Sequence, residues 1–278
     1  MIVFINNKFV DENDAAISPF DRGFLFADGV YESIRSYNGK LFQYKNHIKR
    51  LKRSLKEIQI NFQQTDNLEN IIYELIERNK IRGGAIVYIQ ITRGVSIPRK
   101  HQFPSASVNP TLFVSVQNFS ANISEKENGI KVILDKDTRW LRCDIKSVSL
   151  LPVILSNQKA KSSGAEEAIL IRDGLITEGT HTNFFAVKKN VVFTAPESDF
   201  ILSGITRKVV LKLCINFKIK VKEEFISEKD LKSFNEFFIT STQKEITPVV
   251  QINDWKINNS KPGEITKLLQ AEFSKLSR

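Results

Sequence analysis

The sequence predicts an α+β fold organised as two domains. Its 278 residues give room for two ordinary domains. Hydrophobic residues make up 41% of the chain and charged residues 26%, a composition that can bury a core. Strand-like and helix-like runs follow one another without a regular βαβ order, and no G-x-G-x-x-G motif is present. Mixed sheets with helices are therefore expected, rather than a dinucleotide-binding fold.

The first predicted domain covers residues 1–118. It opens with short strands and turns, and Asn38-Gly39 predicts a two-residue hairpin. A basic amphipathic helix is expected over 45–60, with its cations on the outer faces. Its apolar stripe consists of Ile48, Leu51, Leu55 and Ile58.

A second helix is expected over 67–79, with Asp66 as its cap and Glu69 three residues on. Strands are expected over 85–94 and 111–117. The run VSIPRKHQFPSASVNP, which separates these two strands, is rich in proline and serine and is expected to be a loop.

The polar segment 119–129 is the predicted linker, and residues 130–278 form the second predicted domain. A strand begins this domain, and a helix over 151–162 carries Pro152 in its first turn. Further along, the pattern predicts hairpins over 167–179 and 183–195, a helix over 203–217, strands over 219–224 and 236–242, a short helix over 228–234 and a helix from about 263.

Composition excludes several classes of function. The net charge is +10, but lysine and arginine are spread along the chain among acidic residues, which does not favour nucleic-acid binding. The two cysteines form no Cys/His cluster, so neither a zinc site nor a disulfide framework is expected. No signal peptide or membrane-spanning run is recognised, so we expect a cytoplasmic protein that binds no membrane.

Lys146 is the first candidate for chemistry. It ends the strand-like run RWLRCDIK, among apolar and cationic neighbours such as Trp140, Arg139 and Arg142. In a strand, Asp144 and Lys146 share a face. A lysine becomes a nucleophile or joins an aldehyde when its surroundings lower its pKa. The alternative is an ordinary solvated lysine.

Two further segments offer parts of a cofactor site. Glu178 ends a strand beside a glycine turn, where a carboxylate can hold a cationic ring nitrogen. The run LSGITRK places the N–H groups of Ile205 and Thr206 at a helix start, where a phosphate can bind. Arg50, and hydroxyls such as that of Thr242, can complete such a phosphate-binding site. The alternatives are a turn acid and a simple helix cap.

Arg99 and His101 stand two residues apart in the loop IPRKHQFP. If the loop is extended, both side chains leave on the same side. An arginine with an imidazole donor suits a small carboxylate, and an exposed polar loop is the alternative.

A protein that binds pyridoxal 5'-phosphate supplies a phosphate-binding site, a carboxylate for the ring nitrogen and one lysine. With these parts, the sequence resembles the class IV (fold-type IV) pyridoxal-phosphate aminotransferases, and within them the D-amino acid branch, over essentially the whole chain. The runs that carry this resemblance are DRGFLFADGVYESIRSYNG, HIKRL, TRG with PRKHQFP, RWLRCDIKS, EAIL, TEG with NFF, GITR and TSTQKEITPV.

The resemblance implies a C-terminal domain that forms a pseudo-barrel and a specific role for each site residue. Lys146 would bind the cofactor covalently and then shuttle the substrate's proton. Glu178 would keep the ring nitrogen protonated. The other implied contacts are Arg50, Ile205, Thr206 and Thr242 to the phosphate, Leu202 to the ring, and Tyr31, Arg99 and His101 to the substrate carboxylate.

The implied reaction is a ping-pong transfer of the amino group of a D-amino acid, such as D-alanine or D-glutamate, to a 2-oxo acid. A homodimer is implied, in which Arg99 and His101 reach the partner's active site. A branched-chain L-amino acid aminotransferase, an aminodeoxychorismate lyase of the same fold, or a non-catalytic basic binding protein are the alternatives. His181 and Ser33 depart from the family's usual residues and bear on side-chain preference.

Overall fold

The computed structural model describes residues 1–277, which form two compact units. Unit 1 consists of residues 1–120 and 145–149, and unit 2 of residues 121–144 and those from 150 onward. Each unit combines helices with its own sheet, so the predicted α+β class is confirmed. The segment 145–149, which contains Lys146, folds with unit 1 although the chain on both sides of it belongs to unit 2.

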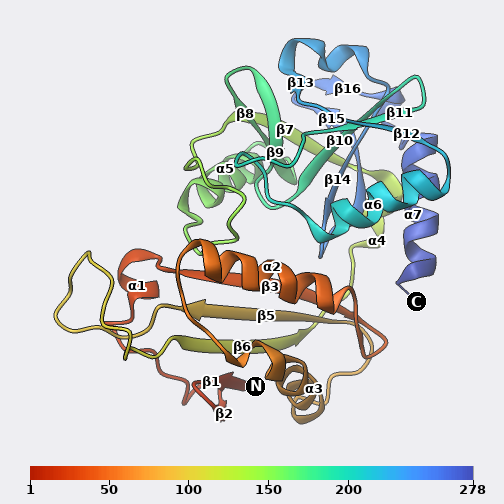
Figure 1. Ribbon diagram of the computed structural model, residues 1–278. Helices are drawn as coiled ribbons and strands as arrows, with labels where there is room; N and C mark the ends of the chain where they lie inside the picture. The colour runs from red at the N-terminus through yellow and green to blue at the C-terminus, as the bar shows by residue number, and fades with distance from the viewer. Residues whose placement is uncertain (278) are drawn as a thin grey trace. The chain divides into compact units, whose positions relative to one another are not determined.

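Unit 1 is built on a six-stranded antiparallel sheet with the order β2-β1-β6-β5-β3-β4 (Figure 1). The Asn38-Gly39 hairpin is confirmed, since both residues have positive φ angles, of 49° and 80°. The strands are β1 (Ile2–Ile5), β2 (Lys8–Asp11), β3 (Gly29–Tyr37), β4 (Lys40–Leu41), β5 (Ala85–Thr92) and β6 (Thr111–Asn118).

Two amphipathic helices cover unit 1's sheet, α2 (Tyr44–Glu57) and α3 (Leu68–Arg78), close to their predicted bounds. Leu51 and Leu75 are fully buried in the same core as Val30 and Ile34, which alternate along β3. Figure 1 shows α2 running alongside β3 and β5. Burial of this apolar face, rather than helix propensity, stabilises both helices.

The predicted cap at Asp66 is wrong. A 3-10 turn, η1 (Gln64–Asn67), precedes α3, whose first residue is Leu68. Asp66 therefore lies outside the capping position, and its carboxylate accepts a hydrogen bond from Lys52 Nζ at 2.8 Å. A short helix that was not predicted, α1 (Arg22–Phe26), is capped by the Asp21 carboxylate, which accepts from the N–H of Gly23.

Unit 2 contains a ten-stranded mixed sheet that curls, as Figure 1 shows, in agreement with the expected pseudo-barrel. Its path is β12-β11-β10-β14-β15-β7-β8-β9-β13, and β16 pairs with β15. Three neighbouring pairs are parallel, β15/β7, β7/β8 and β11/β12. The strands are β7 (Ile130–Lys136), β8 (Glu167–Arg172), β9 (Leu175–Gly179), β10 (Asn183–Lys188), β11 (Val191–Thr194), β12 (Lys220–Glu223), β13 (Ile226–Ser227), β14 (Glu236–Ser241), β15 (Glu245–Ile252) and β16 (Trp255–Lys256).

The helices predicted in unit 2 are present within a few residues of their expected bounds. A helix in the segment predicted as a linker, α4, makes contacts with β15. The helices are α4 (Ile123–Asn128), α5 (Leu151–Ser162), α6 (Ile205–Asn216) and α7 (Glu264–Leu276), with 3-10 turns η2 (Glu228–Ser233) and η3 (Asn258–Ser260).

The expected strand leading to Lys146 is wrong, because residues 137–150 form turns and bends after β7 ends. The Asp137 side chain accepts a hydrogen bond from the N–H of Arg139 at 3.1 Å. Such a local bond offers the backbone an alternative to strand pairing. Asp144 and Lys146 thus do not share the face of a strand.

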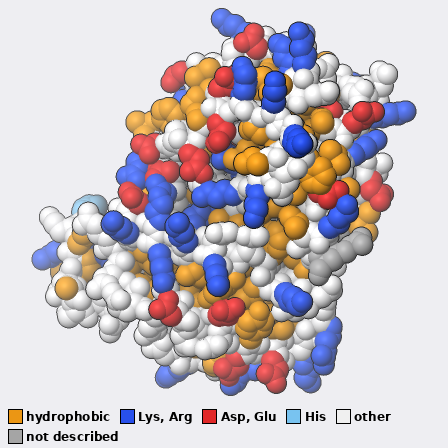
Figure 2. Space-filling model, turned by 45° about the vertical axis from the view of Figure 1, so that its right-hand side comes forward, with side chains coloured by type: hydrophobic (Ala, Val, Ile, Leu, Met, Phe, Trp, Pro, Cys, Tyr) orange, Lys and Arg blue, Asp and Glu red, His pale blue; other side chains and the backbone are white. Residues whose placement is uncertain are grey.

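Basic and acidic side chains are mixed on the face of the molecule that Figure 2 displays. Within residues 1–277, the helices are all too short or too polar to cross a bilayer.

Candidate functional site

Lys146 is fixed in unit 1 by its own backbone. Its carbonyl accepts a hydrogen bond from the N–H of Tyr31 at 3.0 Å, and its N–H donates to the Ser54 hydroxyl at 3.3 Å. The side-chain Nζ lies 4.1 Å from the centre of the Tyr31 ring, within cation–π distance. β3 and α2 therefore position this amine beside Tyr31, another of the predicted site residues.

Arg50, also a predicted site residue, binds a buried carboxylate that sequence reasoning missed. Its Nε and one terminal nitrogen donate to the two oxygens of Glu32, at 2.7 and 2.9 Å. His47 Nδ1 lies 2.8 Å from Glu32, whose side chain is 0% exposed. Although burial opposes it, Arg50 and His47 hold the pKa of Glu32 well below its ordinary value.

Burial lowers the pKa of His47, and its contact with Glu32 opposes that shift. The sequence offers one signal for this cluster: Glu32 stands at an inward position of β3, between Val30 and Ile34. A carboxylate at such a position needs a cationic partner, because an unpaired buried charge is very costly. The partners His47 and Arg50 lie one turn apart on α2.

Arg99 and His101 lie in the loop between β5 and β6, and both pack against Phe26 of α1. The Arg99 guanidinium carbon lies 4.3 Å from the centre of the Phe26 ring, and the His101 ring centre lies 5.5 Å from it. The structure thus brings together the two side chains that the sequence suggested as a carboxylate clamp.

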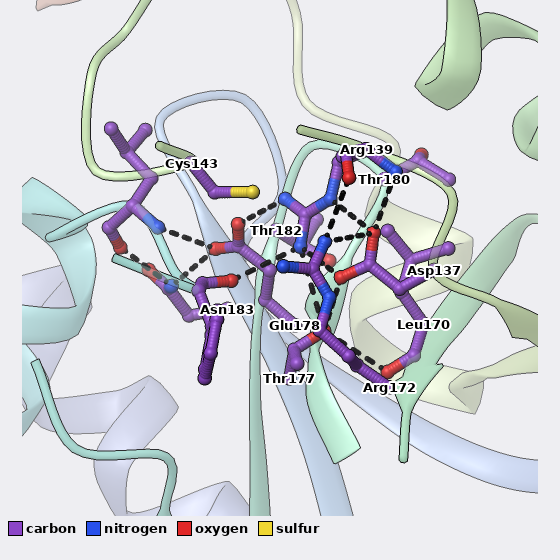
Figure 3. Close-up of polar contacts among 12 residues, drawn as sticks. Asp137, Arg139, Cys143, Leu170, Arg172, Thr177, Glu178, Thr180, Thr182 and Asn183 are labelled. Atoms are coloured by element: carbon purple, nitrogen blue, oxygen red, sulfur yellow. Dashed lines mark hydrogen bonds and ion pairs between the residues drawn. The ribbon is translucent and has the colours of Figure 1, made fainter. Parts of the chain in front are cut away.

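In unit 2, Glu178 is the centre of a buried polar network at the end of β9 (Figure 3). One carboxylate oxygen accepts from Arg139 at 2.5 Å. The other accepts from the Asn183 side-chain amide and from the N–H of Leu202, both at 3.0 Å. Burial raises the pKa of Glu178, while Arg139 and the Leu202 N–H act against that shift.

Arg139 is itself held in place by a second acid, as Figure 3 shows. Its Nε and one terminal nitrogen donate to the two oxygens of Asp137, each at 2.9 Å. The Thr177 hydroxyl also donates to Asp137, at 3.2 Å. Arg142 likewise has an acidic partner, since it binds Asp144.

The start of α6 offers a further group of donors in unit 2. Gly204 is the N-cap and makes no side-chain cap hydrogen bond to the first N–H groups of this helix, which include those of Ile205 and Thr206. A Cβ on Gly204 would stand 2.0 Å from the Asn183 side-chain oxygen. Because Asn183 also donates to the Leu202 carbonyl at 2.9 Å, it ties Glu178 to this helix start.

Thr242 lies just beyond β14, whose Thr240 is opposite Asn183 in the register with β10. The Thr240 hydroxyl is buried and has no hydrogen-bond partner among the described residues. Buried hydroxyls rarely stay unpaired, so this one calls for an acceptor or donor beyond the side chains and backbone of residues 1–277.

These features fit an anionic cofactor with a basic ring nitrogen. A buried carboxylate can accept from a ring N–H, and an uncapped helix start can bind a phosphate. Pyridoxal phosphate has both groups. Residues 1–277 contain no cluster of three or more side chains suited to a metal ion.

The structure also shows the surroundings of His181 and Ser33, the two residues that depart from the family pattern. His181 is 44% exposed, with Nδ1 at 3.0 Å from the Thr180 hydroxyl and 3.2 Å from a Glu167 oxygen. Ser33 is half-buried on β3, on the same side of the strand as Tyr31.

Comparison with known proteins gives a consistent family. Residues 29–252 match the family model described as amino-transferase class IV. A D-alanine aminotransferase of Staphylococcus haemolyticus is 42% identical over 274 residues, which cover 98% of this chain and 96% of that protein.

Among solved structures, a branched-chain amino acid aminotransferase from Escherichia coli superposes with a TM-score of 0.91 at 26% identity, covering 99% of this chain and 94% of that one. A branched-chain aminotransferase from the thermophilic archaeon Thermoproteus uzoniensis, with norvaline, has a TM-score of 0.88 at 23% identity, with 99% of this chain and 94% of that one covered. At that identity the second match bears on the fold alone.

Proposed function

Because this chain belongs to the class IV aminotransferase family, we propose that it transfers the amino group of a D-amino acid, of the D-alanine or D-glutamate type, to a 2-oxo acid by a ping-pong mechanism. The observation that carries this proposal is the similarity, over nearly the full length of both chains, to a D-alanine aminotransferase. The branched-chain alternative is supported by likeness of fold at lower identity and is not favoured.

We assign pyridoxal phosphate as the cofactor. When bound, it supplies an aldehyde that captures amino groups and a protonated ring that accepts the electrons of the substrate's Cα–H bond. Lys146 would hold it covalently, and Glu178 would pair with the ring nitrogen. The remaining contacts that we assign are Arg50, Ile205, Thr206 and Thr242 to the phosphate and Leu202 to the ring.

Lys146 Nζ is the proton carrier in this proposal. It would move one proton from the substrate Cα to the cofactor carbon C4′ when the donor reacts, and from C4′ to Cα when the acceptor is aminated. Its backbone is hydrogen-bonded to Tyr31 and Ser54, so the amine is carried by a part of the chain that is held in place. Glu178 would hold the ring N–H through a charge-assisted hydrogen bond, and the contact with Arg139 favours the ionised carboxylate.

Arg99, His101 and Tyr31 would bind the substrate carboxylate. We propose a homodimer in which Arg99 and His101 act in the active site of the partner subunit. We also propose that the enzyme works in the cytoplasm, since Cys143 and Cys214 are free cysteines that suit a reducing compartment. Neither a nucleic acid nor a membrane has a role in this reaction.

The test of cofactor and stereochemistry is one absorbance titration of the purified protein with pyridoxal phosphate. We expect a yellow protein whose visible band is converted by D-alanine and not by L-alanine. Steady-state assays with 2-oxoglutarate should then give turnover with D-alanine. Turnover of L-leucine alone would refute the D-amino acid assignment, and a colourless protein would favour a non-catalytic binding protein.

The covalent role of Lys146 is tested by borohydride reduction followed by peptide mapping. We expect the label on Lys146, and Lys146→Ala should lose activity by about three orders of magnitude, since it removes the covalent and proton-transfer functions together. Lys161→Ala is the matched control, because Lys161 is an exposed lysine beside Glu166 in the same chain. A label at any other lysine would contradict the assignment.

A further inference from the structure

The carboxylate clamp, Arg99 and His101, sits in a loop that has no regular structure of its own. Residues 93–110, the clamp loop, contain neither helix nor strand. Apolar side chains in it stay largely exposed, with Ile97 at 69% and Phe103 at 55%. Ordering such a loop costs backbone entropy at every residue, and within one chain little apolar burial compensates for it. Other contacts must therefore hold the clamp in place.

Arg22 of α1 supplies such contacts. One terminal nitrogen of its guanidinium donates to the carbonyls of Lys100 and Gln102, at 2.6 and 3.3 Å. The other donates to the carbonyl of His101 at 3.3 Å. The guanidinium thus binds three successive carbonyls of the clamp loop, and it is almost fully buried where it does so.

Asp28 fixes the guanidinium from the opposite side. It accepts from Arg22 Nε at 2.8 Å and from Arg93, through two nitrogens, at 2.7 and 2.9 Å. The Arg93 guanidinium carbon in turn lies 3.7 Å from the centre of the Phe103 ring, in the clamp loop. One carboxylate therefore orients Arg22, which binds the backbone of the loop, and Arg93, the first residue of the loop, which packs on Phe103.

Arg22 also shares a ring with the clamp side chains. Its guanidinium carbon lies 4.7 Å from the centre of the Phe26 ring, the same ring against which Arg99 and His101 pack. Side chains of one short helix, α1, therefore contact both the backbone of residues 100–102 and the side chains of Arg99 and His101.

We infer that Arg22 is a positioning residue for substrate binding: held by Asp28, it sets the backbone from which Arg99 and His101 present their side chains to a carboxylate. This inference rests on the proposed function, which gives Arg99 and His101 that role. A guanidinium is required, because its planar fork can bind several carbonyls and a carboxylate at once, whereas a lysine ammonium is a point charge on a flexible stem.

The primary experiment compares Arg22→Lys with the wild-type holoenzyme. We expect the KM for D-alanine to rise about 10-fold with a smaller change in kcat, since the lost interaction serves substrate binding. The dissociation constant for pyridoxal phosphate should stay the same. Trypsin should cleave the clamp loop faster after Arg99 and Lys100. The matched control is Arg78→Lys, in which an arginine that also pairs with an acid, Glu74, and covers a phenylalanine, Phe9, is changed on an outer helix face.

A double variant separates positioning from general stability. If Arg22 acts through the clamp, Arg22→Lys should raise the KM little further in an Arg99→Ala background, because the group that it positions is already gone. Additive effects of the two changes, or an unchanged KM and cleavage rate in Arg22→Lys, would overturn the inference. If the wild type turns over no amino acid, the proposed function fails, while unchanged trypsin cleavage would by itself refute the anchoring by Arg22.

Discussion

At the level of single residues, the ion pair between Arg139 and Glu178 determines which charge the unit 2 site can offer. Burial raises the pKa of Glu178, and a neutral carboxyl group offers a protonated ring nitrogen no opposite charge. Arg139, fixed by Asp137, supplies the opposing charge at 2.5 Å. The ionised form of the site's acid is therefore favoured by a residue that touches neither substrate nor phosphate in our proposal.

Glu32 is the corresponding buried acid of unit 1, and it makes a pH-dependent prediction. Its folded pKa lies below its ordinary value of 4.5, so its contribution to stability is complete above that pH and is lost as the pH falls. Glu32→Gln leaves Arg50 and His47 without their carboxylate, and we expect it to lower the free energy of unfolding at neutral pH by about 3–5 kcal/mol.

Urea unfolding at a series of pH values checks this prediction. The difference between wild type and Glu32→Gln should shrink between about pH 5 and about pH 3. The exposed pair Glu74–Arg78 provides the control, since Glu74→Gln should change stability by less than about 1 kcal/mol. A difference that is constant over this range would show that the Glu32 charge does not stabilise the fold.

At the level of elements, the sequence predicted the helices and strands in which apolar residues recur on the face that is buried. The stripe of Ile48, Leu51 and Leu55 gives α2, because one helical face must meet the sheet. The strand expected before Lys146 is absent, and there the Asp137 carboxylate accepts from the backbone N–H of Arg139, a local bond that competes with strand pairing. Asn183 and Arg139 were missed for another reason: several of their partners are remote in sequence.

The resemblance to the family named site residues that the local sequence pattern could not identify. Leu202 has no polar side chain, yet its N–H binds Glu178 at 3.0 Å. No periodicity or residue type signals such a backbone contact, which depends on how β9 and the start of α6 meet. The roles of Lys146, Arg99 and His101 come from the same source and stay predictions until they are tested.

Gly204, the N-cap of α6, gives a prediction for a whole element. A Cβ there would stand 2.0 Å from the Asn183 side-chain oxygen, so Gly204→Ala must displace Asn183 from Glu178 and from the Leu202 carbonyl. We expect a dissociation constant for pyridoxal phosphate raised about 10-fold, and a stability loss of about 1–3 kcal/mol. Cofactor titration by absorbance and urea unfolding measure the two effects.

Gly164→Ala is the contrasting variant. Gly164 has a φ of +65° and open space around it, so alanine there is strained by its backbone alone. It should cost about 1–2 kcal/mol of stability and leave cofactor affinity unchanged. Equal loss of affinity in both variants would mean that Gly204 acts only through general stability.

At the level of the whole molecule, net charge and association are separate questions. The excess of ten positive charges is dispersed, and Figure 2 shows acids among the bases on the face displayed. A dispersed charge favours solubility rather than a specific anionic partner. What the proposed function requires instead is a second copy of the chain, because the clamp is assigned to the partner's active site.

Hybrid dimers test that assignment directly. One variant is Lys146→Ala, and the other carries Arg99→Ala together with His101→Ala. If the clamp acts across the subunit boundary, a hybrid dimer has one site with both Lys146 and the clamp intact, and one site with neither. Random re-association of equal amounts should then restore about a quarter of wild-type activity, since about half of the dimers are hybrids with one working site of two. If each chain serves its own site, every site in the hybrid lacks one part, and the mixture should show no activity beyond that of the two variants measured alone.

Sedimentation of the mixture confirms that dimers have formed, so a lack of complementation would place the clamp in the same subunit as its lysine.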